Sequence, residues 1–145
     1  MSDALDVDPA ADDQVVAVVR RIAAPPETVF DYLVDPARFV LWMGVAADLD
    51  ARPGGGYHIT VGPDAVATGD YQVVDPPRRL VFTWGWRGDT DVPVGSTTVE
   101  ILLTPEGEGT RLELRHRGLP GDQSRARHAE GWEMFLDRLT TVIGG

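Results

Sequence analysis

The chain has 145 residues, 43% of them apolar, a formal net charge of −10, and neither cysteine nor lysine. This length fits one domain with one hydrophobic core, and the negative charge repels phosphate backbones, so nucleic acid is not expected as a partner. Without cysteine and lysine the chain cannot form disulfides, thiolate metal sites, cysteine nucleophiles, lysine Schiff bases or a P-loop.

The chain opens with the acidic segment MSDALDVDPAADDQ, residues 1–14, whose five aspartates carry half of the net charge. We expect a disordered tail here. The segment lacks the basic start and apolar stretch of a secretory signal, and no run in the chain approaches the roughly 18 apolar residues of a membrane span. We therefore expect no membrane insertion and a cytoplasmic location. The joint absence of lysine and asparagine beside 13 arginines indicates a GC-rich, bacterial genome.

A strand and two short helices are predicted next. Residues 14–24 (QVVAVVRRIAA) are rich in valine, which favours a strand. Residues 25–35 begin with prolines and Glu27, which favour a helix start. The helix is expected to end before Pro36, because the residue before a proline avoids the helical conformation. A second short helix is predicted at residues 36–43.

From residue 47 onward apolar and polar residues alternate, as is typical of strands with one buried face. The connectors contain the glycine, proline and aspartate expected of turns between antiparallel strands. The last segment instead has apolar residues three and four positions apart, which predicts a long helix at 123–142. The predicted strands lie near 47–51, 56–62, 66–74, 79–87, 96–104 and 110–117.

These elements form an α+β arrangement. In this order the chain resembles the helix-grip fold of the START-related, birch-pollen-allergen-like SRPBCC superfamily, and more narrowly the homologues of the heat-shock-protein-90 ATPase activator. The resemblance implies a single SRPBCC domain at 15–145, in which a curved antiparallel sheet of about six or seven strands wraps around the C-terminal helix and leaves a cavity. The residues that carry it are VFDYLVDPARFVLWMG (29–44), GGGYHI (54–59), GDYQVVDPPRRLVFTW (69–84), GTRLELRHRGL (109–119) and HAEGWEMFLDRL (128–139).

The stretch VDPPRRLVFTWGW places Leu80, Phe82, Trp84 and Trp86 on one strand face, which we expect to look toward the helix. A packed core explains such a face, since burying one large apolar side chain is worth roughly 1.5–3 kcal/mol. A ligand pocket is the alternative, because the inward tyrosines, tryptophans and histidine carry polar groups that need hydrogen-bond partners. We predict a cavity lined by Trp42, Tyr57, Ile59, Tyr71, Phe82, Trp84, Trp86, Val99, Ile101, Leu114, His116, His128, Trp132, Phe135 and Leu139.

The histidines are the candidates for chemistry. His128, four residues before Trp132, is either a polar group at the cavity mouth or a helix-start histidine bonded to a backbone carbonyl or a carboxylate, and we prefer the second interpretation. His116 is expected to be a core or rim histidine with its hydrogen bonds satisfied, and His58 to be exposed. The three lie on different elements without metal-ligand spacing, so neither metal nor cofactor is expected. Gly131 is expected to allow close packing of the last helix.

Three functions remain open. The preferred one is a small-molecule-binding protein that holds a hydrophobic or aromatic ligand between the sheet and the C-terminal helix. The second is an enzyme of the cyclase, dehydratase or hydrolase type, with His128 or His116 and a carboxylate such as Glu130 or Glu133 as acid and base. The third is a co-chaperone of heat-shock protein 90, disfavoured because a short acidic tail stands where the eukaryotic activator carries a docking domain. The loop GWRGDTDVPVG (85–95) is a candidate homodimer interface or gate.

Overall fold

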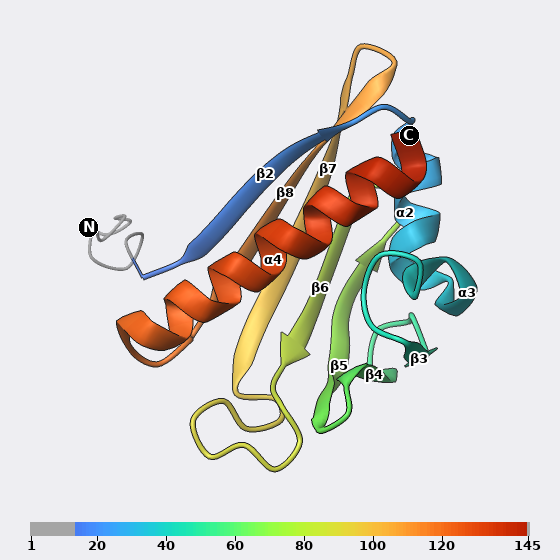
Figure 1. Cartoon of the computed structure of the whole chain (residues 1–145). Helices are drawn as coiled ribbons and strands as arrows, with labels where there is room; N and C mark the ends of the chain where they lie inside the picture. The colour runs from blue at the N-terminus through green and yellow to red at the C-terminus, as the bar shows by residue number, and fades with distance from the viewer. Residues whose placement is uncertain (1–13, 145) are drawn as a thin grey trace, which may run out of the picture.

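The structure, a computed structural model, describes residues 14–144. Their strands form one 7-stranded antiparallel sheet in the order β2-β8-β7-β6-β5-β4-β3. Figure 1 shows the long helix α4 lying diagonally across one face of this sheet. This arrangement confirms the predicted α+β helix-grip fold. The elements are β2 (Val16–Ile22), α2 (Pro26–Val34), α3 (Pro36–Phe39), β3 (Ala46–Leu49), β4 (Gly56–Gly62), β5 (Ala65–Asp75), β6 (Arg79–Trp84), β7 (Thr97–Glu106), β8 (Gly109–Arg117) and α4 (Gly121–Gly144).

The predicted disordered tail at 1–14 falls almost wholly outside the described residues. Within the described part of the chain, no helix has both the length and the apolar character needed to cross a membrane.

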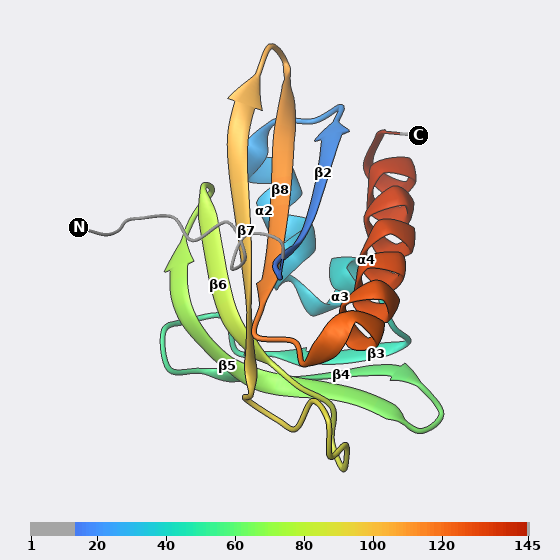
Figure 2. The ribbon, with the colours of Figure 1, turned by 90° about the vertical axis from the view of Figure 1, so that its left-hand side faces the viewer.

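The sheet curls around α4 because β5 bends between its two halves. Its C-terminal half pairs with β6 and its N-terminal half with β4. A register shift between Tyr71 and Val73 interrupts the β5–β6 pairing, and such irregularities increase the local bend and twist of a strand. In Figure 2, β3 and β4 consequently turn beneath the N-terminal half of α4. The curl brings the β4–β5 turn to the same end of the molecule as the start of α4.

Two short helices cover the opposite end of the sheet. Asp35 separates them: it ends α2, and its carboxylate accepts a hydrogen bond from the backbone N–H of Ala37 at 3.2 Å in the first turn of α3. Helix α3 ends at Phe39, earlier than predicted, and the chain continues as a turn. Trp42 still anchors this turn, because its indole N–H donates to the carbonyl of Tyr32 at 2.8 Å.

Strand β6 ends at Trp84, three residues before the predicted end, because the following loop folds back across it. A Cβ at Gly85 would overlap the carbonyl oxygen of Pro93, so only glycine leaves room for this crossing. The loop is closed by a bond of 2.8 Å from the backbone N–H of Trp86 to the carbonyl of Val92. Residues 85–95, the predicted gate or interface, thus form an ordered projection beside the sheet.

Candidate ligand-binding site

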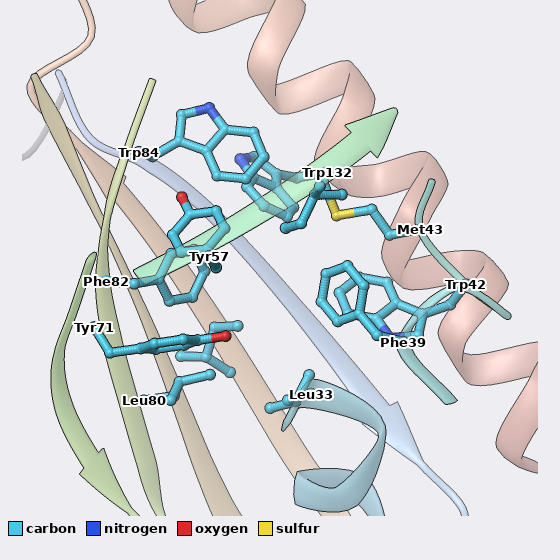
Figure 3. A pocket seen from close by; sticks show the side chains of 12 residues that line it. Leu33, Phe39, Trp42, Met43, Tyr57, Tyr71, Leu80, Phe82, Trp84 and Trp132 are labelled. Carbon is cyan, nitrogen blue, oxygen red and sulfur yellow. The ribbon is translucent and has the colours of Figure 1, made fainter. Parts of the chain in front are cut away.

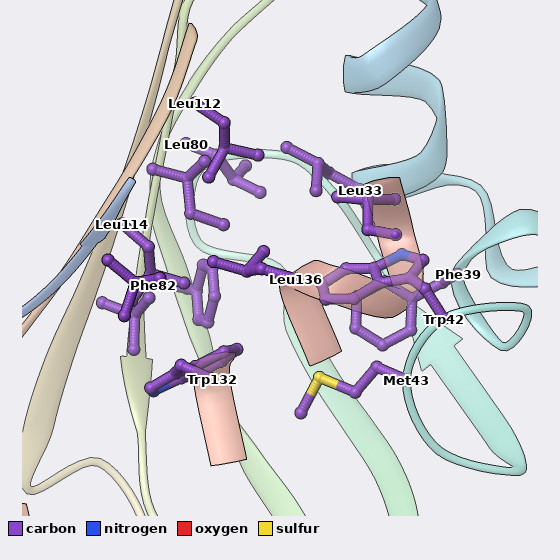
Figure 4. Close-up of a cluster of buried hydrophobic side chains, with 14 of the residues drawn as sticks. Leu33, Phe39, Trp42, Met43, Leu80, Phe82, Leu112, Leu114, Trp132 and Leu136 are labelled. Atoms are coloured by element: carbon purple, nitrogen blue, oxygen red, sulfur yellow. The ribbon is translucent and has the colours of Figure 1, made fainter. Parts of the chain in front are cut away.

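The space between the sheet and the helices is almost completely filled at its inner end. The enclosed void there measures about 20 Å³, which is room for about one water molecule. Figure 3 shows side chains from the sheet, the short helices and α4 converging on this inner void, and Figure 4 shows leucines packing beside it. Its lining residues are Leu33, Phe39, Trp42, Met43, Tyr57, Ile59, Tyr71, Leu80, Phe82, Trp84, Ile101 and Trp132.

A much larger space lies beside the N-terminal half of α4. This open cleft has a volume of about 620 Å³, within the range of roughly 300–1,000 Å³ that is usual for ligand pockets. It is bounded by α4, by the β4–β5 turn and by the loop 85–95. Its apolar floor is formed by Met43, Trp84, Trp86, Trp132 and Phe135, and its polar rim by Asp64, Arg87, Asp89, Asp91, Arg127 and His128.

Three tryptophans form the centre of the cleft floor. The Trp84 ring centroid lies 5.3 Å from that of Trp86 with an interplanar angle of 84°, and 5.0 Å from that of Trp132 at 53°. These are edge-to-face and tilted contacts of the kind that aromatic rings favour. Trp84 and Trp132 are buried, whereas Trp86 is half-buried. Trp86 therefore offers most of the exposed aromatic surface of the floor, and Trp84 and Trp132 support it from behind.

His116 fixes the buried side of this aromatic cluster. Its Nδ1 accepts a hydrogen bond from the Trp132 indole N–H at 3.0 Å, and its Nε2 lies 2.8 Å from Oγ1 of Thr97. The Thr97 hydroxyl in turn donates to the carbonyl of Trp84 at 2.8 Å, so Nε2 carries the proton. Burial, and secondarily the nearby His128, lower the pKa of His116 to about 3. His116 is a neutral core histidine with both nitrogens engaged, as predicted.

His128 combines both of its predicted roles. It borders the cleft, and its Nδ1 donates to the Ser124 carbonyl at 2.8 Å, as a histidine near a helix start would. Its Nε2 accepts a bond of 3.0 Å from the Trp86 indole N–H. Burial lowers the pKa of His128, which keeps the ring neutral. Because both nitrogens are occupied, this geometry offers no free base, and the candidate partners Glu130 and Glu133 are exposed.

Trp84 differs from Trp86 and Trp132 in the hydrogen bonding of its indole N–H. The buried N–H of Trp84 has no hydrogen-bond partner among residues 14–144, and neither has the buried hydroxyl of Ser124. Buried polar groups are paired in the great majority of cases, so unpaired ones call for an explanation. Trp84 lines both the inner void and the open cleft. An unpaired donor therefore lies in the wall between the two spaces.

The structure divides the fifteen predicted cavity residues into three groups. Those at the open cleft are Trp84, Trp86, His128, Trp132 and Phe135. Those that line only the inner void are Trp42, Tyr57, Ile59, Tyr71, Phe82 and Ile101. The remaining four line neither space and are 0% exposed, because α4 closes fully onto the sheet where they lie: Val99, Leu114, His116 and Leu139.

Apart from His128, the sequence did not identify the rim of the cleft. Asp64, Arg87, Asp89, Asp91 and Arg127 come from a turn, a loop and a polar helix face, where charged residues ordinarily face solvent. The only signal was the loop 85–95 itself, singled out as a gate. The interpretation of Gly131 as a close-packing residue is wrong: an added Cβ would meet no atom within 4 Å, and the residue borders the cleft.

No cluster of three or more histidine, aspartate or glutamate side chains suited to a metal ion occurs within residues 14–144. The rim carboxylates of the cleft are therefore not grouped as a metal site. They act as separate charges around an apolar floor.

Known proteins similar to this chain include both family members and solved structures. Residues 23–144 match the family described as Activator of Hsp90 ATPase homolog 1-like protein. An AHSA1-like protein from Rhizobium etli is 42% identical, with 90% of this chain and 83% of that chain covered and a TM-score of 0.71. CalU16 from Micromonospora echinospora is 33% identical, with 89% and 75% covered and a TM-score of 0.73.

A third similar structure is DynU16, a protein from the dynemicin biosynthetic locus. It is 28% identical, with 89% of this chain but 46% of DynU16 covered, and a TM-score of 0.77. No curated protein sequence matches the chain. The family match extends over most of the chain and agrees with the helix-grip fold. The chain therefore belongs to the Activator of Hsp90 ATPase homolog 1-like family, and this membership supports a ligand-binding protein of the SRPBCC superfamily.

Proposed function

We propose that the protein binds a small molecule with a flat aromatic body and a polar edge in the open cleft. The observation that carries the proposal is the cleft of about 620 Å³ with a tryptophan floor and a charged rim. The inner void of about 20 Å³ admits no such molecule. The ligand site is thus at the mouth of the space between sheet and helix, rather than deep within it.

The charged rim favours a ligand with polar groups rather than a plain hydrocarbon. Arg87 and Arg127 stand on it together with Asp64, Asp89 and Asp91. Charges of both signs around an apolar floor can pair with hydrogen-bonding groups at the edge of a ring, which gives orientation and specificity. A purely apolar ligand would desolvate these charges without replacing their hydrogen bonds with water.

The cleft is formed before any ligand binds. Both carboxylate oxygens of Asp89 accept backbone bonds at 3.3 Å, from the N–H groups of Asp91 and Val92. The bond from Trp86 to His128 ties the loop 85–95 to α4. Because these contacts hold the loop in place, little ordering is required on binding, which favours affinity.

The origin of one similar protein agrees with a small-molecule role. DynU16 belongs to a biosynthetic locus, where small organic molecules are made. For this chain we favour binding over catalysis, because His116 and His128 use both ring nitrogens in hydrogen bonds within the protein. A general base requires a free lone pair within reach of the ligand.

The proposal can be tested by isothermal titration calorimetry with 2-naphthol, a flat aromatic probe with one polar group. Wild-type protein should bind it at one site. Trp86→Ala should weaken the binding at least about tenfold, because a large part of the apolar floor is removed. Val94→Ala, in the same loop but 51% exposed and outside the cleft lining, is the matched control and should bind like wild type. Absence of binding, or equal affinities for wild type and Trp86→Ala, would contradict the proposal.

A further inference from the structure

The open cleft and the inner void share a wall made of three side chains, Met43, Trp84 and Trp132. Trp132 is held by its hydrogen bond to His116, and Trp84 is enclosed by other aromatic rings. Met43 is 1% exposed and is unbranched, with three rotatable bonds and no polar group to tether it. Figure 3 shows it between Trp132 and Trp42. Met43 is the part of the wall that can move.

The backbone around Met43 is fixed, so a movement there would be confined to the side chain. The Met43 N–H donates to the Phe39 carbonyl at 3.0 Å, and the Val45 N–H donates to the Thr60 carbonyl at 2.8 Å. Between them Gly44 has a φ of 78°, and a Cβ at that position would lie 2.7 Å from the Thr60 oxygen. Only glycine meets both conditions without strain. The turn therefore holds its shape while the methionine rotates.

Tyr71 brings a second polar group without a protein partner to the inner void, besides the Trp84 N–H. In Figure 3 the hydroxyl of Tyr71 points toward the centre of the void. Tyr71 is 4% exposed and forms no side-chain hydrogen bond within residues 14–144, and its hydroxyl oxygen, unlike the fully inaccessible Trp84 N–H, keeps some accessible surface. The neighbouring Tyr57 differs, because its hydroxyl donates to the Thr83 carbonyl at 2.6 Å. Burial raises the pKa of Tyr71 above its ordinary value, so the group remains a hydroxyl that can both donate and accept.

We infer that the inner void is a subsite of the open cleft: a slim arm of the ligand displaces the Met43 side chain and places a terminal oxygen against the Tyr71 hydroxyl. The inference rests on the proposed function of the cleft. It narrows the ligand class to a flat aromatic body with a short apolar arm that ends in a hydroxyl or carbonyl group. An apolar arm replaces the contacts of Met43, and its terminal oxygen supplies the partner that Tyr71 lacks.

Three probes with the same aromatic body test this subsite by calorimetry on the full chain. They are 2-naphthol, 6-butyl-2-naphthol and 6-(3-hydroxypropyl)-2-naphthol, of which the last two have arms of equal length. Wild-type protein should bind both armed probes more tightly than 2-naphthol, and the hydroxyl-ended probe roughly two- to twelvefold more tightly than the butyl probe, as one hydrogen bond provides.

Two variants test which residues cause these gains in affinity. Tyr71→Phe should remove the preference for the hydroxyl-ended probe while leaving the affinity for 2-naphthol unchanged. Met43→Ile should remove the gain from both arms, because a β-branched side chain is stiff at χ1 and would keep the wall closed. Leu41→Ala is the control, since Leu41 is 52% exposed on the same turn and lines neither space.

The outcomes separate the two proposals. If 2-naphthol binds but neither arm increases the affinity of wild-type protein, the subsite is overturned and the proposed function stands. Equal affinities of the two armed probes would overturn the assignment of Tyr71. Failure of 2-naphthol to bind would overturn the proposed function itself. The comparison of probes on wild-type protein decides these points even if a variant does not fold.

Discussion

The two halves of α4 meet the same sheet in different ways. In the C-terminal half, Leu136 and Leu139 are 0% exposed and pack directly onto the strands. In the N-terminal half, His128 and Gly131 remain partly exposed and border the open cleft. The first half of the helix also carries fewer large apolar residues than the second half. The sheet contributes as well, because its β4–β5 turn borders the open cleft beside the first half of α4 instead of packing directly onto the helix.

The two regions also differ in whether their buried polar groups have hydrogen-bond partners. Both ring nitrogens of His116 and the indole N–H of Trp132 have partners at 3.0 Å or less. Trp84 lines the cleft, and its N–H has no partner among the described residues. The cleft also borders Gly131, for which packing gives no reason. The paired groups around His116 are explained by stability, whereas the unpaired Trp84 N–H and the Gly131 position are better explained by binding.

Stability should depend most strongly on the inner region. Leu136→Ala should lower the free energy of unfolding by about 2–5 kcal/mol, because it removes buried methyl groups and leaves a cavity. Urea denaturation followed by circular dichroism measures the change. Met134→Ala, on the exposed side of the same helix turn, is the control and should stay within about 0.5 kcal/mol of wild type. A loss below about 1 kcal/mol for Leu136→Ala would show that the inner region is not tightly packed.

Acid should weaken the same inner region through His116. Its pKa is about 3 in the folded protein and ordinarily 6.5, so below pH 6.5 the unfolded chain binds the extra proton and the folded protein does not. The folded protein therefore keeps its full stability with respect to His116 above pH 6.5. As the pH falls from 6.5 toward 3, the free energy of unfolding decreases by about 1.4 kcal/mol per pH unit. Urea denaturation at pH 7, 6 and 5 measures the slope. His116→Gln should flatten it; identical slopes for wild type and His116→Gln would refute the assignment.

The sequence predicted the inner region well and the cleft only in part. Residues such as Val99 and Leu114 could be assigned to a buried strand face, because apolar and polar residues alternate along these strands with a period of two. Whether a buried face encloses space depends on how sharply β5 bends, and its register shift near Tyr71 leaves no clear mark in the residues. Rim charges such as Asp89 and Arg127 look like ordinary surface residues. Their role depends on the loop position, which local sequence does not determine.

Affinity, rather than stability, should depend on the cleft. Phe135→Ala should weaken 2-naphthol binding about tenfold by removing part of the apolar floor. The free energy of unfolding should fall less than in Leu136→Ala, since Phe135 is only half-buried. Calorimetry and urea denaturation on the same two variants give the comparison directly. If Leu136→Ala reduced the affinity while Phe135→Ala left it unchanged, the assignment of the two regions would be reversed.

The smallest expected effect concerns Gly131, where a substitution should raise the stability of the protein but lower its affinity for the ligand. Glycine inside a helix costs about 0.5–1 kcal/mol relative to alanine, and an added Cβ would meet no atom within 4 Å. Gly131→Ala should therefore raise the free energy of unfolding by about 0.5–1 kcal/mol. The new methyl group would project into the cleft and lower the affinity for 2-naphthol.

Ala126→Gly, at an exposed position of the same helix, is the reverse control: it should destabilise the protein by a similar amount and leave the affinity for 2-naphthol unchanged. A Gly131→Ala protein that is more stable and binds as well as wild type would mean that the ligand does not approach α4 at this point.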